Sequence, residues 1–195
     1  MRLLDNNLKS FQVVGKLPQW AYWVVGGILF YAAWTGVGIW ARWSALNQLR
    51  DSKDSWTSDG ILEQATDFTC VPSSIVMLLR DEGINTTTYE VAIVADTDIR
   101  GTDGSGIVKA AGHFGFHTRK SKLTFDQFMS SNLPGILIFR RHGTKHAAYI
   151  LPSVDPGLMM AKDPVDGILY FSKDDANEWF GSDMWEVYLF ERGAK

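Results

Sequence analysis

A run without charged residues, from Trp20 to Trp40, constrains this 195-residue chain more than any other feature. About 20 apolar residues in a helix match the roughly 30 Å hydrocarbon core of a membrane. Aromatic side chains stand at both ends of the run, as in the aromatic belts of membrane spans. The sequence therefore predicts one transmembrane helix over residues 18–43, and hence a single-pass protein with membrane lipid as a partner. The alternatives are a buried core helix and a cleaved signal peptide, although no small-x-small cleavage site follows the run before Trp40.

The segments on either side of the predicted span leave its orientation open. Basic residues are balanced between the tail over residues 1–17 and the segment after the span, so the positive-inside rule does not decide which side holds the soluble domain. Ala32 and Gly36 have the small-xxx-small spacing through which another transmembrane protein can pack. Residues 44–60 are polar and end in breakers of regular structure, so we predict a juxtamembrane linker there.

Composition narrows the chemistry of the rest of the chain. A net charge of -3 and a pI near 5.8 provide no basic surface for nucleic acid. The single cysteine permits neither an internal disulfide nor a multi-cysteine zinc site. His113, His117 and His142 fall on separate predicted elements without the spacing of metal ligands. We therefore expect no metal and no cofactor.

The single cysteine, Cys70, lies where a helix is predicted to begin. An apolar run follows it and stops at Gly83, a pattern typical of a helix. Cysteine reacts as the thiolate, which the positive end of a helix stabilises. Gln64, six residues earlier, offers a side-chain amide that could hold an oxyanion together with a helix-terminal backbone N–H. For Cys70 alone, a small buried residue is the alternative, because most free cysteines are of that kind.

The hydrophobic period changes midway through the segment that starts near Ile61. Besides the helix at Cys70, helices are predicted from a cap at Thr87 or Thr88 through Val94, from a cap at Ser105 through Ala111, and over 123–130 with Thr124 as cap. Strands are predicted at residues 135–140, 147–151, 158–162 and 185–190. Helices followed by antiparallel strands predict an α+β domain over residues 61–192.

Two polar residues flank the predicted strands. His146 precedes the second strand, and Asp163 follows the third. On adjacent hairpin strands the two side chains can hydrogen-bond, so that Asp163 would orient an imidazole that accepts the proton of Cys70. Taken singly, a strand-end histidine satisfied by backbone and an ordinary Asp-Pro turn are the alternatives.

Short motifs follow one another in a fixed order through this segment. They are Gln64 six residues before Cys70, Gly104-Ser105-Gly106-Ile107, Ala110-Ala111, Gly115-Phe116, Pro134-Gly135-Ile136, His146, Asp163-Pro164, Gly167 and Phe171-Ser172. In this order the chain resembles the C39 peptidases, papain-like cysteine proteases known as leader-processing domains of bacteriocin and peptide exporters and as stand-alone proteins. The resemblance implies a papain-like fold with Cys70 as nucleophile and His146 as base. It further implies Asp163 as the orienting acid, Gln64 as an oxyanion-hole donor, and a peptide substrate cut after a double-glycine leader. With the predicted span, we expect the protein in a bacterial plasma membrane.

Two departures from the family pattern keep another class of function in view. Val71 stands where the family usually has glycine or alanine, and Ala147-Ala148 where it usually has bulkier residues. The chain also has no Gly-rich nucleotide-binding loop of a transporter. The alternative is a membrane-tethered C39-like module with little or no activity, serving as a binding or assembly subunit of a larger membrane complex. A third possibility is an amidase or acyltransferase, because a thioester does not fix the final acceptor.

Overall fold

The computed structural model of this chain describes residues 18–141, 143–181 and 184–193, and the predicted tail over 1–17 lies outside them. After Trp40 the chain divides into two compact units. Helix α1 (Gln19–Arg50) supplies the first with its part up to Trp40, where large apolar side chains such as Trp23 and Phe30 are exposed. Within the described residues, α1 is the one helix long and apolar enough to cross a membrane. Membrane anchors and signal sequences both have such a helix.

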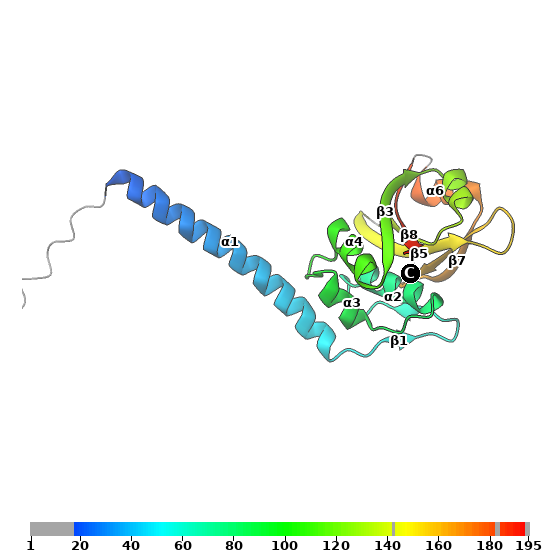
Figure 1. Cartoon of the computed structure of the whole chain (residues 1–195), viewed down its shortest axis with the longest axis horizontal. Coiled ribbons are helices and arrows are strands. Elements are labelled where there is room, and N and C mark those ends of the chain that lie inside the picture. The colour runs from blue at the N-terminus through cyan, green and yellow to red at the C-terminus, as the bar shows by residue number, and fades with distance from the viewer. Residues whose placement is uncertain (1–17, 142, 182–183, 194–195) are drawn as a thin grey trace, which may run out of the picture. The chain divides into compact units, whose positions relative to one another are not determined.

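The second unit begins with helices, as the sequence predicts. Its elements before the main sheet are β1 (Ser55–Trp56), β2 (Leu62–Glu63), α2 (Cys70–Asp81), α3 (Thr88–Val94) and α4 (Gly104–His113) (Figure 1). A capping box at Thr87 starts α3. The predicted cap Ser105 is wrong for α4. The Asp103 carboxylate accepts the Gly106 N–H at 2.8 Å, so the helix begins before Ser105.

A six-stranded antiparallel sheet forms the second half, in the order β3-β8-β4-β5-β6-β7. Its elements are β3 (Phe116–Leu123), α5 (Phe125–Ser131), β4 (Gly135–Arg141), β5 (Thr144–Pro152), β6 (Met159–Asp163), β7 (Gly167–Phe171), α6 (Lys173–Phe180) and β8 (Trp185–Arg192). The four predicted strands correspond to β4, β5, β6 and β8. Strands β3 and β7 and helix α6 are not among the predicted elements, and in β3 largely polar side chains hide the pattern. Strand β3 forms because it pairs along its whole length with β8, about 70 residues later in the chain.

Both faces of the sheet are covered, as the alternation of side chains along the strands indicates. On β4, Ile136 joins a buried cluster with α2 and α4, whereas Leu137 joins a second cluster with α5 and α6. Strands β5 and β8 alternate in the same way. Strands buried on both faces lose the apolar-polar alternation and become continuous apolar runs, which explains the long apolar stretches of β4 and β5.

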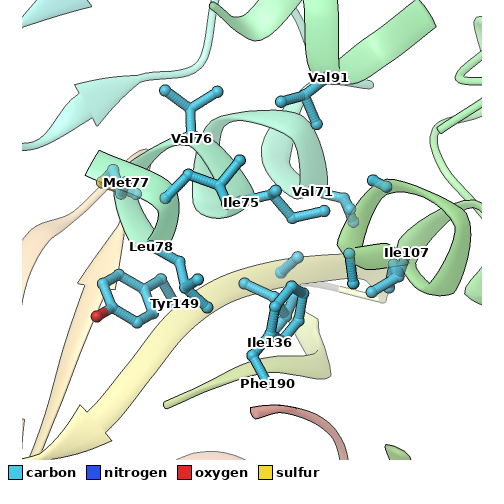
Figure 2. Close-up of a cluster of buried hydrophobic side chains, with 14 of the residues drawn as sticks. Val71, Ile75, Val76, Met77, Leu78, Val91, Ile107, Ile136, Tyr149 and Phe190 are labelled. Carbon is cyan, nitrogen blue, oxygen red and sulfur yellow. The ribbon is translucent and has the colours of Figure 1, made fainter. Parts of the chain in front are cut away.

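Helix α2 is the centre of the first cluster. Every residue from Val71 to Leu79 is buried, because α2 packs against β5 on one side and α3 on the other. Figure 2 shows Leu78 directed toward Tyr149 of the sheet and Val76 directed the opposite way. Burying an apolar side chain of this size contributes roughly 1.5–3 kcal/mol. The helix that begins with Cys70 is therefore fixed by the centre of the core.

Residues 44–60 contain more regular structure than the linker predicted there. Helix α1 continues to Arg50, and β1 pairs with β2. Ala45 and Leu49 are fully buried in a cluster with Phe68 and Ala92. Ala45 and Leu49 are four residues apart and therefore lie on one face of α1. This short apolar face is hard to recognise because the surrounding sequence is polar. The last turns of α1 belong to the second compact unit.

Candidate active site

Cys70 is the first residue of α2 and is half-buried. The preceding turn sets its position, because the buried Thr69 donates its hydroxyl to the Thr66 carbonyl oxygen at 2.8 Å. With its hydroxyl turned back in this way, Thr69 makes no side-chain cap on α2. The first bond of the helix runs from the Ser73 N–H to the Thr69 carbonyl at 2.9 Å. The backbone N–H groups ahead of that bond have no partner within the helix and lie at its positive end, beside the thiol.

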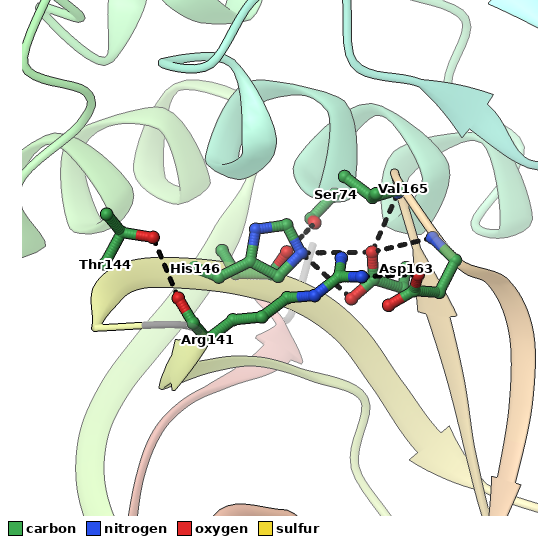
Figure 3. A network of polar contacts seen from close by, with 8 residues as sticks. Ser74, Arg141, Thr144, His146, Asp163 and Val165 are labelled. Carbon is green, nitrogen blue, oxygen red and sulfur yellow. Dashed lines mark hydrogen bonds and ion pairs between the residues drawn. The ribbon is translucent and has the colours of Figure 1, made fainter.

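His146 on β5 is joined to Asp163 at the end of β6 by a buried hydrogen bond (Figure 3). The imidazole Nε2 lies 2.9 Å from Oδ2 and 3.0 Å from Oδ1 of the carboxylate. The two residues are only 8% and 2% exposed. The backbone ladder between β5 and β6 ends at the pair Tyr149 and Lys162, and the two side chains meet just beyond it. The structure thus brings together two of the residues singled out in the sequence.

This hydrogen bond fixes the tautomer and the orientation of the imidazole. Because Asp163 accepts at Nε2, the proton of a neutral ring lies there, and Nδ1 is left for another partner. In Figure 3 the second ring nitrogen of His146 points away from Asp163. Phe139, opposite His146 in the β4–β5 ladder, packs edge-on against the ring with centroids 5.3 Å apart. Cys70 lines the same cleft as His146, and its side chain is one of the partners that act on the imidazole.

The charges of the site support one another. Burial lowers the pKa of His146, but the Asp163 carboxylate and the Cys70 side chain together outweigh burial and raise this pKa to about 9. Burial raises the pKa of Asp163, whereas His146 and two backbone N–H groups hold it below its usual value. Opposite charges and hydrogen bonds to the charged form shift a pKa in these directions. At neutral pH the structure therefore favours a protonated imidazole between the Asp163 carboxylate and the Cys70 side chain.

A tight turn presents Asp163. Its Oδ1 accepts the backbone N–H of Val165 at 2.8 Å and that of Asp166 at 3.2 Å. The carbonyl oxygen of Pro164 accepts the Gln64 N–H at 3.1 Å. The backbone of Gln64 is thereby held against the turn that carries the acid, although the two are about 100 residues apart in sequence.

The side chain of Gln64 is half-buried, and its Oε1 is buried without a hydrogen-bond partner in the part of the chain that the structure describes. A buried amide usually has its hydrogen bonds satisfied. Gln64 is thus tied to the site through its backbone, and it is not among the residues that line the cleft at Cys70.

Val71, the departure from the family pattern beside Cys70, is only 4% exposed. It belongs to the same buried cluster as Ile107 of α4 (Figure 2). Its branched side chain takes part in core packing between α2 and α4, and it also lines the cleft at Cys70.

A cleft of about 270 Å³ opens at Cys70 and His146. Tyr188 narrows it, because the tyrosine hydroxyl occupies the place that a Cβ at Gly104 would need. That hydroxyl donates to Glu186 at 3.2 Å, and Lys120 pairs with the same carboxylate at 3.0 Å. These three residues are not predicted from the sequence, because Tyr188 and Glu186 of β8 meet Lys120 of the unpredicted strand β3. Gly104 in the Gly104-Ser105-Gly106 motif was the one local signal that another group approaches the backbone closely here.

His113 and His117 are not among the residues that line this cleft. His113 ends α4 and contacts Phe114 edge-on, and His117 lies on β3. His142 falls outside the described residues. Among the residues that are described, no three metal-ligating side chains come together.

This architecture, with a cysteine at the start of a central helix and a histidine and an acid on the sheet packed against it, is that of papain-like peptidases. Residues 59–184 match the Peptidase C39 family, and the chain belongs to this family. The predicted resemblance and the predicted α+β fold are thereby confirmed.

Solved structures and curated sequences provide further comparisons. The peptidase domain of Streptococcus ComA, a bifunctional ABC transporter of a quorum-sensing pathway, has a TM-score of 0.57 at 23% identity, over 68% of this chain and 96% of that one. A double-glycine motif protease from an AMS/PCAT transporter, crystallised with the leader peptide, has a TM-score of 0.58 at 14% identity, over 72% and 99%. Uncharacterized proteins of Methanothermobacter thermautotrophicus and Methanothermobacter marburgensis are each 27% identical, over 107 and 125 residues. These stretches cover 55% and 64% of this chain and 72% and 84% of the two relatives.

Proposed function

We propose that this protein is a membrane-anchored cysteine peptidase that cleaves a peptide by attack of the Cys70 thiolate, with His146 as the acid–base group. One observation carries the proposal. Asp163 engages Nε2 of His146, which leaves Nδ1 for the thiol in the cleft that Cys70 and His146 share. Membership of the C39 family supports the same assignment.

The reaction follows from these positions. The Cys70 thiolate attacks the scissile carbonyl carbon, and the carbonyl oxygen becomes an oxyanion. The imidazolium of His146 then gives its proton to the departing amine, which leaves an acyl thioester on Cys70. Neutral His146 next takes a proton from water, whose oxygen attacks the thioester, and the peptide acid leaves as the thiolate is restored. Asp163 stays ionised throughout and holds the ring in one orientation.

Gln64 is the proposed oxyanion donor, together with the backbone N–H groups at the start of α2. The hydrogen bond between its backbone and the Asp163 turn supports this role. The donor is the side-chain Nε2, because Oε1, which has no partner within the described residues, can only accept a hydrogen bond. Preorganised donors of this kind stabilise the charge that develops in the transition state.

The proposed substrate is a peptide with a double-glycine leader. The solved relative crystallised with its leader peptide is a double-glycine motif protease. In this chain, the Tyr188 hydroxyl against Gly104 narrows the cleft beside Cys70. A narrow cleft favours residues without side chains next to the scissile bond.

The proposed domain organisation is an anchor over residues 18–43 and a peptidase domain over 61–192, with the segment between them packed on the domain. The exposed apolar surface of α1 supports an anchor, because a helix that is apolar all round is stable in lipid. Ala32 and Gly36 offer a face for another transmembrane protein, and the location is a bacterial plasma membrane.

The rival function is a tethered C39-like module with little activity. Val71 and the lack of a transporter's nucleotide-binding loop in this sequence are the features that favour it. Val71 packs in the core and also lines the cleft, so its packing alone does not separate the two functions. The retained bond between His146 and Asp163 favours the enzyme, since a binding module has no need of a buried ion pair at the cleft.

The test is the hydrolysis of synthetic peptides by the full chain in detergent. Peptides with an apolar leader that ends in Gly-Gly are compared with peptides in which either glycine is replaced by valine, and products are identified by mass spectrometry. We expect cleavage after Gly-Gly, its loss with Val, and its loss in Cys70→Ala. Cleavage that persists in Cys70→Ala would contradict the proposal. If Cys70 reacts with a thiol reagent but none of the peptides is cleaved, the result would favour the rival module.

A further inference from the structure

His146 and Asp163 lie on two different hairpins of the sheet. Backbone hydrogen bonds join these hairpins along only part of their length. The β4–β5 hairpin carries His146, and the β6–β7 hairpin carries Asp163. The backbone ladder between β5 and β6 stops at the pair Tyr149 and Lys162. At the catalytic end, side chains must therefore keep the two hairpins in register.

An ion pair outside the cleft joins the same two hairpins. Arg141, the last residue of β4, donates through Nη2 to Oδ1 of Asp166 at 2.7 Å. The two side chains are 26% and 24% exposed, so the contact is partly shielded from water. Charge-assisted hydrogen bonds are about twice as strong as neutral ones, and partial burial reduces the screening of their charges. Figure 3 shows the long side chain of Arg141 reaching along the strand to the turn that begins at Asp163.

The ion pair between Arg141 and Asp166 is linked to Asp163 through one backbone N–H group. The backbone N–H of Asp166 donates to Oδ1 of Asp163 at 3.2 Å, and the same carboxylate accepts from Nε2 of His146. At its other end, Arg141 pairs with Thr144 across the hairpin, and its carbonyl oxygen accepts the Thr144 hydroxyl at 2.9 Å. A continuous path of contacts thus runs from the turn end of the β4–β5 hairpin, which carries His146, to Asp163.

We propose that Arg141 is a positioning residue that acts through Asp166 and holds Asp163 in hydrogen-bonding position against His146. The inference rests on the proposed function and adds to it a residue outside the cleft. Arg141 also neutralises Asp166, whose carboxylate would otherwise stand as a second negative charge in the turn that carries Asp163.

Arg140 is a matched control for this role. It is the neighbouring arginine on the same strand, its side chain is exposed, and it donates to the Gly143 carbonyl oxygen at 3.0 Å. Arg140→Gln removes the same charge from the same strand but leaves the Asp166 contact intact. Arg141→Lys is a rescue variant, because a lysine can restore one charge-assisted bond but not the fork of a guanidinium.

The test is the pH dependence of the alkylation of Cys70 by iodoacetamide in the full chain. Since the chain has one cysteine, the label reports on Cys70 alone. The groups that face His146 are Cys70 from α2 and Asp163 from β6, and Lys145, Lys120 and Glu186 line the same cleft. In the alkaline limb of the profile, the rate rises to that of a free thiolate as the imidazolium loses its proton. The pH of this limb therefore follows the strength of the bond between His146 and Asp163.

We expect Arg141→Gln to lower the alkylation rate at pH 6 by roughly three- to tenfold, because less of Cys70 is held in the ion pair, and to move the alkaline limb about one pH unit lower. Arg140→Gln should match the wild type, and Arg141→Lys should recover part of the loss. A limb that moves to higher pH would indicate a purely electrostatic effect of the lost positive charge and would overturn the inference. An unchanged profile with a lower melting temperature would indicate a merely structural ion pair and would also overturn it.

The proposed function fails separately from this inference. If wild-type Cys70 and Cys70 in His146→Ala react at the same slow rate, the activated thiolate does not exist. If the wild type reacts rapidly and Arg141→Gln reacts like it at every pH, only the role of Arg141 is refuted.

Discussion

Raising the pH from 6 to 10 should destabilise the second compact unit through His146. The folded unit raises the pKa of this histidine from 6.5 to about 9, because its partners, Asp163 above all, outweigh the cost of burial. A group with a raised pKa in the folded state contributes its full stabilisation below its unfolded pKa and loses it as the pH rises through its folded pKa. The window of loss therefore lies between pH 6.5 and about 9. A shift of this size corresponds to about 3 kcal/mol.

The assay is thermal unfolding of the full chain in detergent micelles, followed by tryptophan fluorescence at several pH values across this window. For a unit of about 150 residues, 3 kcal/mol corresponds to a fall in Tm of roughly 6–12 °C. Asp163→Asn keeps the shape of the acceptor but removes its charge, so its Tm should be lower at pH 6 and should change less with pH. A wild-type Tm that stays constant across the window, or an equally steep fall in Asp163→Asn, would refute the ion pair.

Three further substitutions test the oxyanion donor, a close approach of helices and the packed end of α1. Gln64→Ala should slow peptide hydrolysis roughly 100-fold while iodoacetamide alkylation of Cys70 stays near the wild-type rate, because a displacement at carbon forms no oxyanion; equal losses in both assays would contradict this role. Gly106→Ala should destabilise the unit by about 2 kcal/mol in urea unfolding, since its Cβ would overlap a backbone carbonyl oxygen. Gly112→Ala in the same helix meets only open space and should be neutral or stabilising, so equal effects of the two changes would be contrary to the packing. Leu49→Ala should cost roughly 2–5 kcal/mol, because Leu49 is fully buried, and a cost near zero would mean that the end of α1 is not part of the unit.

The sequence predicts those elements whose signals are local. The apolar run after Cys70 and the caps at Thr87 and Thr124 each depend on neighbouring residues, and the structure has helices there. The strands of the sheet interior are equally readable, because their apolar runs are long. His146 and Asp163 could be paired from sequence because each stands at the end of a predicted strand.

The features that the sequence does not predict depend on distant partners. Strand β3 is polar and becomes a strand only by pairing with β8. Leu49 lies in a polar stretch and is buried only because Phe68 and Ala92 fold against it. Arg141 has no local pattern at all, since its significance comes from a turn that starts 22 residues later in the chain.

That His146 activates Cys70 is tested most directly by the rate of Cys70 alkylation at pH 6 in the wild type and in His146→Ala. An ordinary cysteine, with a pKa of about 8.5, is almost entirely protonated at this pH and reacts slowly. We expect the wild-type thiolate, held by the imidazolium, to react at least roughly tenfold faster than the variant. We also expect the variant to gain rate only as the pH approaches that of a free thiol. Equal and slow alkylation of the two proteins at pH 6 would contradict the account.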